Sequence, residues 1–293
     1  MSTSETGVRT QLKLLGSSSE PGMEPVVHRR QQLTLHWPEY VMEAALLGMF
    51  MISACLFTAI LQFPASPVRR AIPFAIARRV LTGVAMGLTA IALIYSPWGQ
   101  RSGAHFNPSV TLTFLRLGKI KKVDAGFYLL FQFAGAIAGV LLATLALGSR
   151  IGDPTIQYAA TYPGDTGSAI AALGEFVISF LQMTIVLSVS NHTRFSRLTG
   201  LAAGLMVAMY ITIESPYSGM SMNPARTLGS ALPSGIWKGF LIYLVVPPLA
   251  MLAAAQTYVW RKGKSAVRCC KLDHVPNRDC IFCGMRGSAH EQR

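Results

Sequence analysis

The stretches "SGAHFNPSV" (residues 102–110) and "SGMSMNPART" (residues 218–227) are two copies of one pattern, in which Ser-Gly is followed by three residues and then Asn-Pro. Asn is a favoured N-cap and Pro is favoured at the first helical position, so each copy predicts the start of a helix. The segment after each copy is too short to cross a bilayer and too apolar for an ordinary loop. We therefore predict two re-entrant half-helices, which are tolerated at membrane depth where they line a cavity.

The composition around these copies indicates a membrane protein. The chain is 51% hydrophobic and only 13% charged, whereas a soluble domain usually carries about a quarter charged residues. A bilayer core of about 30 Å requires about 20 apolar residues in a helix, and six stretches approach that length. The predicted spans are Tyr40–Phe63, Arg79–Trp98, Ala125–Leu147, Ser168–Ser190, Leu198–Ile213 and Gly239–Trp260.

The two half-helices fall at corresponding places in the two halves of the chain. The first follows the second span and the second follows the fifth, so they enter the membrane from opposite sides. Each half also opens on a similar segment with an early Glu, "MEAALLGMF" in the first and "GEFVISFLQ" in the second. The predicted fold is therefore an all-α membrane protein with six transmembrane helices and two half-helices in an inverted repeat.

The basic residues predict the topology. With an even number of spans, both termini lie on one side, and 19 of the 26 lysines and arginines fall on that side, which leaves 7 on the other. The positive-inside rule then places both termini in the cytoplasm. The predicted location is a plasma membrane or a bacterial inner membrane. The same rule explains the net charge of +13 without a nucleic-acid partner. Four arginines in the first outer loop (Arg69, Arg70, Arg78 and Arg79) go against the rule.

The repeated motif predicts a pore. The side-chain oxygens of Asn107 and Asn223 can accept from free N–H groups of their own helices, which leaves two NH2 groups as donors near the midplane. Each helix start carries about half a positive charge, so a cation in such a pore is disfavoured. A neutral molecule with an acceptor oxygen is instead held by the two Asn donors.

These residues carry a family resemblance. The segments "SGAHFNPSVT" and "SGMSMNPARTLGSA" resemble the signature loops of aquaporins and aquaglyceroporins, and "YLLFQFAGAIAG" (Tyr128–Gly139) resembles their third helix. Ser109 departs from the Ala usual in the first loop, but Ser is small enough to preserve the bend. The resemblance implies a passive channel for water and small uncharged solutes that excludes protons and ions, is not an enzyme, needs no cofactor and assembles as a homotetramer in the lipid bilayer.

The resemblance also implies a selectivity constriction. Arg226, three residues into the second half-helix, corresponds to the Arg of the family's outer constriction, and an intramembrane charge is functional by default. Ile211, Met220 and Met86 occupy the other constriction positions. Ile211 stands where strict water channels usually carry His, which favours larger solutes, yet Thr227 stands where the glycerol branch usually has Asp. Water and glycerol both stay open as substrates.

Three further residues are predicted to support the re-entrant loops. In the family, Glu residues like Glu43 and Glu175 accept hydrogen bonds from the backbone of these loops. A buried carboxylate requires such donors. His105 is expected to pack beside the first half-helix without contacting solute.

The C-terminal tail carries a second candidate site. Cys269, Cys270, His274, Cys280 and Cys283 are zinc-ligand types, and four of them would complete a tetrahedral shell. Their spacing matches no strict zinc-finger template, so a reduced tail with metal-free thiols is the alternative. The predicted regions are an N-terminal cytoplasmic tail (1–36), the channel domain (37–261) and this Cys-rich cytoplasmic tail (262–293).

Two other classes of protein fit part of the pattern. A secondary transporter also uses inverted repeats and broken helices, but it usually requires a coupling-ion site, and few charges lie within the spans. A metal- or redox-sensing membrane protein with a closed pore would use the Cys-rich tail as its active element.

Overall fold

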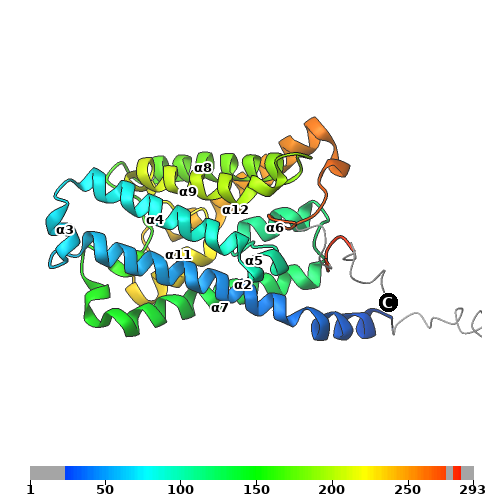
Figure 1. Cartoon of the computed structure of the whole chain (residues 1–293), viewed down its shortest axis with the longest axis horizontal. Coiled ribbons are helices and arrows are strands. Elements are labelled where there is room, and N and C mark those ends of the chain that lie inside the picture. Colours follow the sequence, from blue (N-terminus) through cyan, green and yellow to red (C-terminus); the bar gives the residue numbers. More distant parts are fainter. Residues whose placement is uncertain (1–23, 275–279, 285–293) are drawn as a thin grey trace, which may run out of the picture. The chain divides into compact units, whose positions relative to one another are not determined.

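The computed structural model describes residues 24–274 and 280–284 of the chain. The chain divides into two compact units, Met1–Trp37 and Pro38–Arg293, and all that follows about packing concerns the second. Throughout the described residues the regular structure is helical, without strands (Figure 1). The long helices are α2 (Glu24–Gln62), α4 (Ala75–Tyr95), α7 (Lys122–Leu147), α8 (Ser168–Ser190), α9 (Thr199–Ile213) and α12 (Phe240–Lys262).

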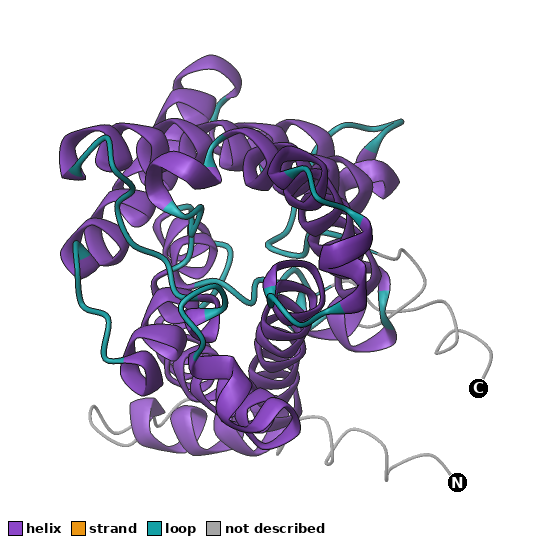
Figure 2. Cartoon of the chain, turned by 90° about the vertical axis from the view of Figure 1, so that its left-hand side faces the viewer, coloured by secondary structure: helices purple, strands orange, loops and turns teal. Residues whose placement is uncertain are grey.

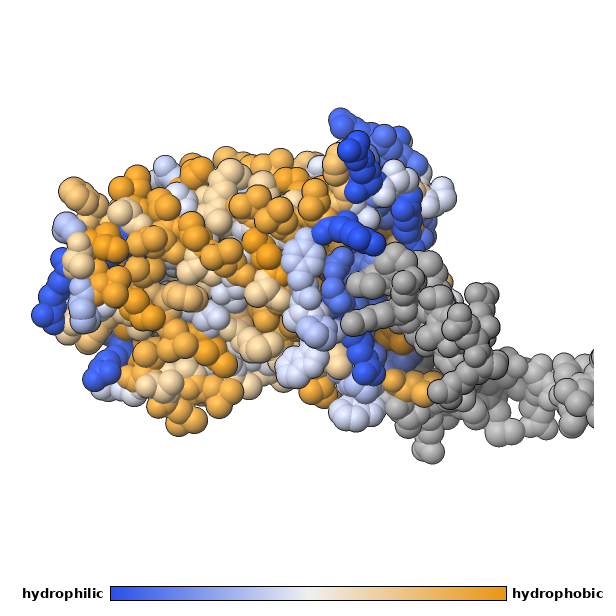
Figure 3. All heavy atoms as spheres, in the orientation of Figure 1, coloured by the Kyte–Doolittle hydropathy of each residue, from blue (hydrophilic) through white to orange (hydrophobic). Residues whose placement is uncertain are grey.

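Six helices in the described part are long and apolar enough to cross a membrane. They coincide with the six predicted spans, and the all-α fold is confirmed. Hydrophobic residues cover the middle of the face in Figure 3, and hydrophilic residues gather toward its two ends. This distribution is what a bilayer requires, because apolar side chains face lipid while charged ones reach water.

Several helix boundaries differ from the predicted spans, among them the start of α2 and the end of α4. Helix α2 starts at Glu24, within the segment expected to be a tail, and Pro38 lies inside it. Helix α4 ends at Tyr95 rather than Trp98, because Ser96 caps a new helix, α5 (Pro97–Ser102), by accepting a hydrogen bond from Gly99 N at 3.0 Å. Pro97 at the first position of α5 favours this restart.

Both predicted half-helices are present. They are α6 (Pro108–Arg116) and α11 (Pro224–Ser234), each with Asn as N-cap and Pro at its first position. The remaining short elements are α3 (Pro67–Ala71), α10 (Ser215–Ser218), η1 (Gly148–Gly152), η2 (Gln157–Ala159), η3 (Ser196–Leu198) and η4 (Lys264–Ala266).

The packing of the helices follows the inverted repeat. Helix α4 packs on α9, while α8 packs on α12 and α6 lies against both α7 and α12. Figure 2 views the helices end-on and shows loops reaching into the space that they surround. Glycines permit the close approach between α4 and α9: a Cβ added at Gly87 would lie 2.6 Å from the carbonyl oxygen of Gly204. Small residues at such crossings are typical of membrane helix pairs.

The structure gives three of the four arginines in the predicted first outer loop a physical role. Arg69 donates to the carbonyl of Gln62, the last residue of α2, and Arg70 donates to Ala65. Arg78 donates to the carbonyls of Ile72 and Pro73. Carbonyls near a helix C-terminus lack helical partners, and cations are favoured there. These three arginines therefore satisfy local backbone groups, although they oppose the charge rule.

Candidate pore and its supporting contacts

The two Asn side chains cap their own half-helices and contact each other's loop. Asn107 Oδ1 accepts from Ser109 N at 2.8 Å, and Asn223 Oδ1 accepts from Ala225 N at 3.0 Å. Asn107 Nδ2 donates to Met222 O, and Asn223 Nδ2 donates to Phe106 O, both at 2.9 Å. An amide NH2 carries two donor hydrogens. Each Asn therefore donates one of these hydrogens to the opposite loop and keeps the other as a free donor.

The backbone before each Asn adopts an unusual conformation. Ala104 and Phe106 have φ of 56° and 28°, and Met220 and Met222 in the second copy have φ of 54° at both positions. Non-glycine residues rarely adopt positive φ, and such strain persists only where the surroundings hold it. The two loops repeat this conformation at matched positions, which marks them as equivalent parts of the inverted repeat.

Glu43 holds the first loop. Its side chain is fully buried and Oε1 accepts from Ser102 Oγ at 2.7 Å and from His105 N at 3.1 Å. Oε2 accepts from Phe106 N at 2.6 Å and from Gln132 Nε2 at 2.8 Å. Four donors on one carboxylate provide the compensation that a buried charge requires.

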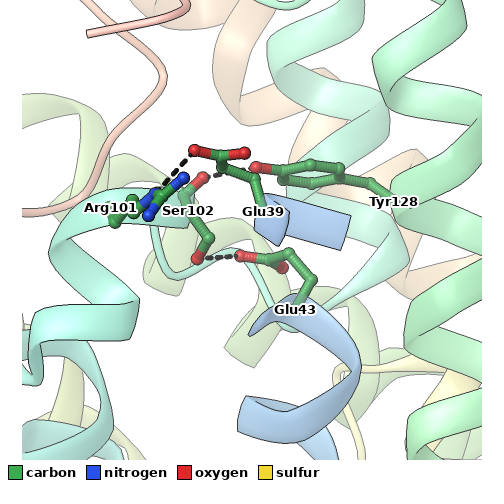
Figure 4. Close-up of polar contacts among 5 residues, drawn as sticks. All are labelled: Glu39, Glu43, Arg101, Ser102 and Tyr128. Carbon is green, nitrogen blue, oxygen red and sulfur yellow. Dashed lines mark hydrogen bonds and ion pairs between the residues drawn. The ribbon is translucent and has the colours of Figure 1, made fainter. Parts of the chain in front are cut away.

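Figure 4 shows the neighbourhood of this carboxylate. Ser102 Oγ points toward Glu43, and the hydroxyl of Tyr128 donates to the carbonyl of Ser102 at 2.6 Å. One turn before Glu43 in α2, Glu39 forms an ion pair with Arg101 at 2.8 Å. Glu39 and Glu43 of α2 therefore both bind α5, the helix that leads into the first loop.

Glu175 holds the second loop in a matching arrangement. Oε1 accepts from Ser218 Oγ at 2.8 Å and from Ser221 N at 2.6 Å, while Oε2 accepts from Met222 N at 2.7 Å. Tyr243 Oη donates to the carbonyl of Ser218 at 2.5 Å, as Tyr128 does to Ser102. The serine, tyrosine and loop N–H contacts recur in both halves, so the repeat extends from sequence to hydrogen bonding.

A cavity of about 450 Å³ passes both Asn residues. On α4 its lining residues recur every three or four positions from Ala75 to Ile94. One face of that helix therefore borders the cavity from Ala75 to Ile94, a length of roughly 28 Å at a rise of 1.5 Å per residue. That length approaches the thickness of a bilayer core. The cavity thus runs most of the way across the predicted membrane-spanning region.

The four predicted constriction residues all border this cavity. They are Met86, Ile211, Met220 and Arg226. Met86 and Met220 are buried, at 3% and 5% exposure. Nη1 of Arg226 is buried without a hydrogen-bond partner in the described part of the chain. A buried guanidinium N–H beside a cavity can donate to a molecule inside it.

Comparison with known proteins agrees with this geometry. Residues 32–258 match the family model described as major intrinsic protein. The chain belongs to the major intrinsic protein family. Its predicted resemblance to aquaporins is thereby confirmed, and members of this family are passive channels rather than enzymes.

Among curated relatives, the chain is 37% identical over 176 residues to the putative aquaporin NIP4-1 of Arabidopsis thaliana, covering 60% of each protein. It is 36% identical over 185 residues to aquaporin NIP1-1 of the same plant, covering 61% of this chain and 62% of the relative. The alignments thus span about three fifths of these relatives. The fold also matches the aquaglyceroporin from Plasmodium falciparum, with a TM-score of 0.62 at 19% identity over 76% of this chain and 95% of that chain.

The tail of this family member contacts the first re-entrant loop. His105 is buried, with Nδ1 3.1 Å from Thr111 Oγ1 and Nε2 2.9 Å from the carbonyl oxygen of Cys270. Leu272 N donates to Gly103 O at 3.1 Å. His105 lies beside Phe114 of α6, and it also borders the cavity and binds the tail.

The structure brings together four of the five predicted metal ligands. The ligand atoms of Cys269, His274, Cys280 and Cys283 all lie within 4.8 Å of one another. Cys270 is not among these four, so the described geometry supports a smaller ligand set than the five residues predicted. Hydrogen bonds with Cys270 and Cys280 raise the pKa of the Cys269 thiol, and the hydrogen bond from Cys269 lowers the pKa of Cys280 to about 3.

Sequence reasoning missed several contributors to this site. Gln132 binds both Glu43 and Thr111, at 2.8 Å and 3.0 Å, from the middle of α7. Leu272 borders the cavity although it lies in the tail. Gln132 falls within the stretch 128–139 that resembles the family's third helix, so the sequence carried a signal for it. Nothing local in the sequence distinguishes Leu272.

Proposed function

We propose that this protein is a passive channel that conducts water and small uncharged solutes and excludes protons and ions. The observation that carries the proposal is the pair of N-capping residues Asn107 and Asn223, which border one cavity. Each donates a hydrogen bond of 2.9 Å to a backbone carbonyl of the opposite loop. Each keeps one N–H for a passing acceptor oxygen. The relatives named aquaporins and the matched aquaglyceroporin support the same activity.

Ion exclusion follows from the helix starts. Helices α6 and α11 each begin at the cavity, where each N-terminus carries about half a positive charge. Two such ends raise the energy of a cation between them, hydronium included. Arg226 adds a full positive charge at the same cavity. Half-helix ends and an Arg that exclude protons and cations are the general device attributed to aquaporin-type pores.

Selectivity among neutral solutes is assigned to the ring of Met86, Ile211, Met220 and Arg226. Three apolar walls and one donor suit a solute that has both a carbon surface and an oxygen. Glycerol and similar small polyols are therefore proposed substrates beside water. In this proposal Glu43 and Glu175 act on the loops rather than on solute, since both carboxylates bind loop N–H groups. His105 acts by joining the first loop to the tail.

The proposed setting is a homotetramer in a plasma or bacterial inner membrane, with both termini cytoplasmic. The orientation rests on the 19 basic residues that share the side of the termini. The tetramer rests on the resemblance to aquaporins. No cofactor enters the proposed conduction mechanism.

Stopped-flow light scattering on proteoliposomes tests this function. An outward water gradient and then a glycerol gradient should each relax faster than in protein-free vesicles. A pH-sensitive dye inside the same vesicles should show no added proton leak. Equal rates with and without protein, or a fast proton leak, would contradict the proposal.

A further inference from the structure

We propose that Cys269, His274, Cys280 and Cys283 bind one zinc ion, and that the bound zinc holds the residues between the first two ligands against the end of the pore cavity. The gating half of this inference rests on the proposed channel function, whereas the zinc site does not.

The four ligand atoms already have the dimensions of a zinc shell. Zinc–sulfur bonds of about 2.3 Å in a tetrahedron place two sulfurs about 3.8 Å apart. Cys269 Sγ lies 3.6 Å from Cys280 Sγ, and His274 Nε2 lies 3.2 Å from Cys283 Sγ. All four atoms fit within 4.8 Å. Three thiolates and one imidazole form a closed, four-coordinate set of the structural type.

The site joins two parts of the tail. Cys269 and His274 lie on one segment, and Cys280 and Cys283 form a Cys-x-x-Cys pair on another. Cys269 and Cys280 are buried, and none of the described cysteines is in a disulfide. A metal that ties the two segments together would supply the stability that so short a segment lacks.

The residues between Cys269 and His274 are the ones that contact the pore. The Cys270 carbonyl meets His105 Nε2 at 2.9 Å, and Leu272 N donates to Gly103 O at 3.1 Å. Asp273 accepts from Gln100 Nε2 at 2.9 Å. Each contact reaches α5 or the first re-entrant loop, so this stretch, Cys270–Asp273, forms a cap on the loop.

Leu272 places this cap at the conducting path. Its side chain is 5% exposed and borders the same cavity as Asn107. It binds the loop that follows α4 and α5, so it lies toward the Ile94 end of the cavity. From the second tail segment, Phe282 packs edge-on against Tyr128 at 6.1 Å between ring centroids. Both segments joined by the proposed metal thus pack beside the first re-entrant loop, and the apolar side chain of Leu272 borders that end of the cavity.

The metal is measured first. The full chain, purified without added zinc on a tag that contains neither His nor Cys, should carry about one zinc per chain by elemental analysis. Less than about 0.2 zinc per chain with intact thiols would overturn the site, because structural sites bind too tightly to be that empty. A Cys269–Cys280 disulfide found by mass spectrometry in place of zinc would also overturn it.

Single substitutions test the ligand set. Cys280→Ser and Cys283→Ser should each lose zinc, and cobalt loaded into the wild-type chain should give the intense visible bands of tetrahedral thiolate coordination, which these two variants should lack. Cys270→Ser is the matched control, since it is a neighbouring buried thiol outside the four, and it should retain full zinc. Loss of zinc in Cys270→Ser alone would overturn the assignment.

Flux measurements test the cap. Cys280→Ser should conduct water several-fold faster than the zinc-loaded wild type in proteoliposomes, because Leu272 is released. Leu272→Ala should also conduct faster while it retains its zinc. Equal water flux in the wild type, Cys280→Ser and Leu272→Ala would overturn the proposal that the tail caps the pore. A chain that binds zinc but conducts in none of these forms would contradict the channel function and leave the zinc site supported, so the two failures are distinguishable.

Discussion

The replacement Asn223→Asp tests the electrostatics of the pore most directly. Asn223 Oδ1 accepts from the N–H groups of Ala225 and Arg226, at 3.0 Å and 3.2 Å, and an Asp oxygen can keep both bonds. A carboxylate at a helix start is stabilised by up to about 2 kcal/mol, so the new side chain should remain ionised. The second oxygen would face the carbonyl of Phe106, where the amide now donates at 2.9 Å.

The size of the effect follows from the charge at the start of α11. An added negative charge changes the local value from about +0.5 to about −0.5. For a cation at about 8 Å and an effective dielectric constant of about 20, that change is worth about 2 kcal/mol. A barrier lower by about 2 kcal/mol raises the cation leak roughly 30-fold. Water flux should fall, because the donor N–H is lost.

The assay is a paired measurement on one set of proteoliposomes, with stopped-flow water flux beside dye-reported proton and potassium leak. Asn107→Asp should raise the leak similarly, since its amide makes the equivalent bond to Met222 O at 2.9 Å. Asn191→Asp is the control, because Asn191 caps the end of α8 away from the cavity and should leave both rates at the wild-type value. Unchanged flux and leak in both pore variants would refute the reasoning.

Three further substitutions test separate parts of the structure. Ile211→His should narrow and polarise the constriction, so glycerol flux should fall by a larger factor than water flux; equal factors would remove Ile211 from the constriction. Glu175→Gln should leave one buried donor of the second loop without an acceptor and destabilise the chain by about 1–3 kcal/mol, measured as a lower thermal midpoint in detergent; an unchanged midpoint would contradict this. Gly87→Ala should lower the stability of the chain by about 1–3 kcal/mol through overpacking against α9. Gly126→Ala is the control and should lower it less, because an added Cβ there meets nothing within 4 Å. Equal thermal midpoints for the two variants would argue against close packing at Gly87.

Much of the fold was predictable because its signals are local. The span Ser168–Ser190 has the predicted bounds, and α9 begins one residue after its predicted start. Hydropathy over about 20 residues suffices for such spans. The starts of α6 and α11 depend on Asn-Pro, whose capping acts within a single turn. The sequence analysis did not predict that a new helix, α5, begins at Pro97, although Pro97 is a local signal of the same kind.

The candidate site was less predictable, because its contacts join distant parts of the chain. Glu43 and Glu175 were selected by resemblance, but the sequence did not specify which N–H groups each would bind. Nor did it show that each Asn spends a hydrogen on the opposite loop. These bonds depend on how six spans bring positions such as 107 and 222 within 2.9 Å of each other.

Composition and neighbours within a few turns are enough to predict the membrane environment, the six spans, the two half-helices and the inverted repeat. The clustering of four of the five tail ligands and the position of Leu272 at the cavity depend instead on how the chain packs in three dimensions. No periodicity or cap encodes such contacts. They exist because the packed helices present Gly103 and His105 at a surface where the tail finds backbone partners.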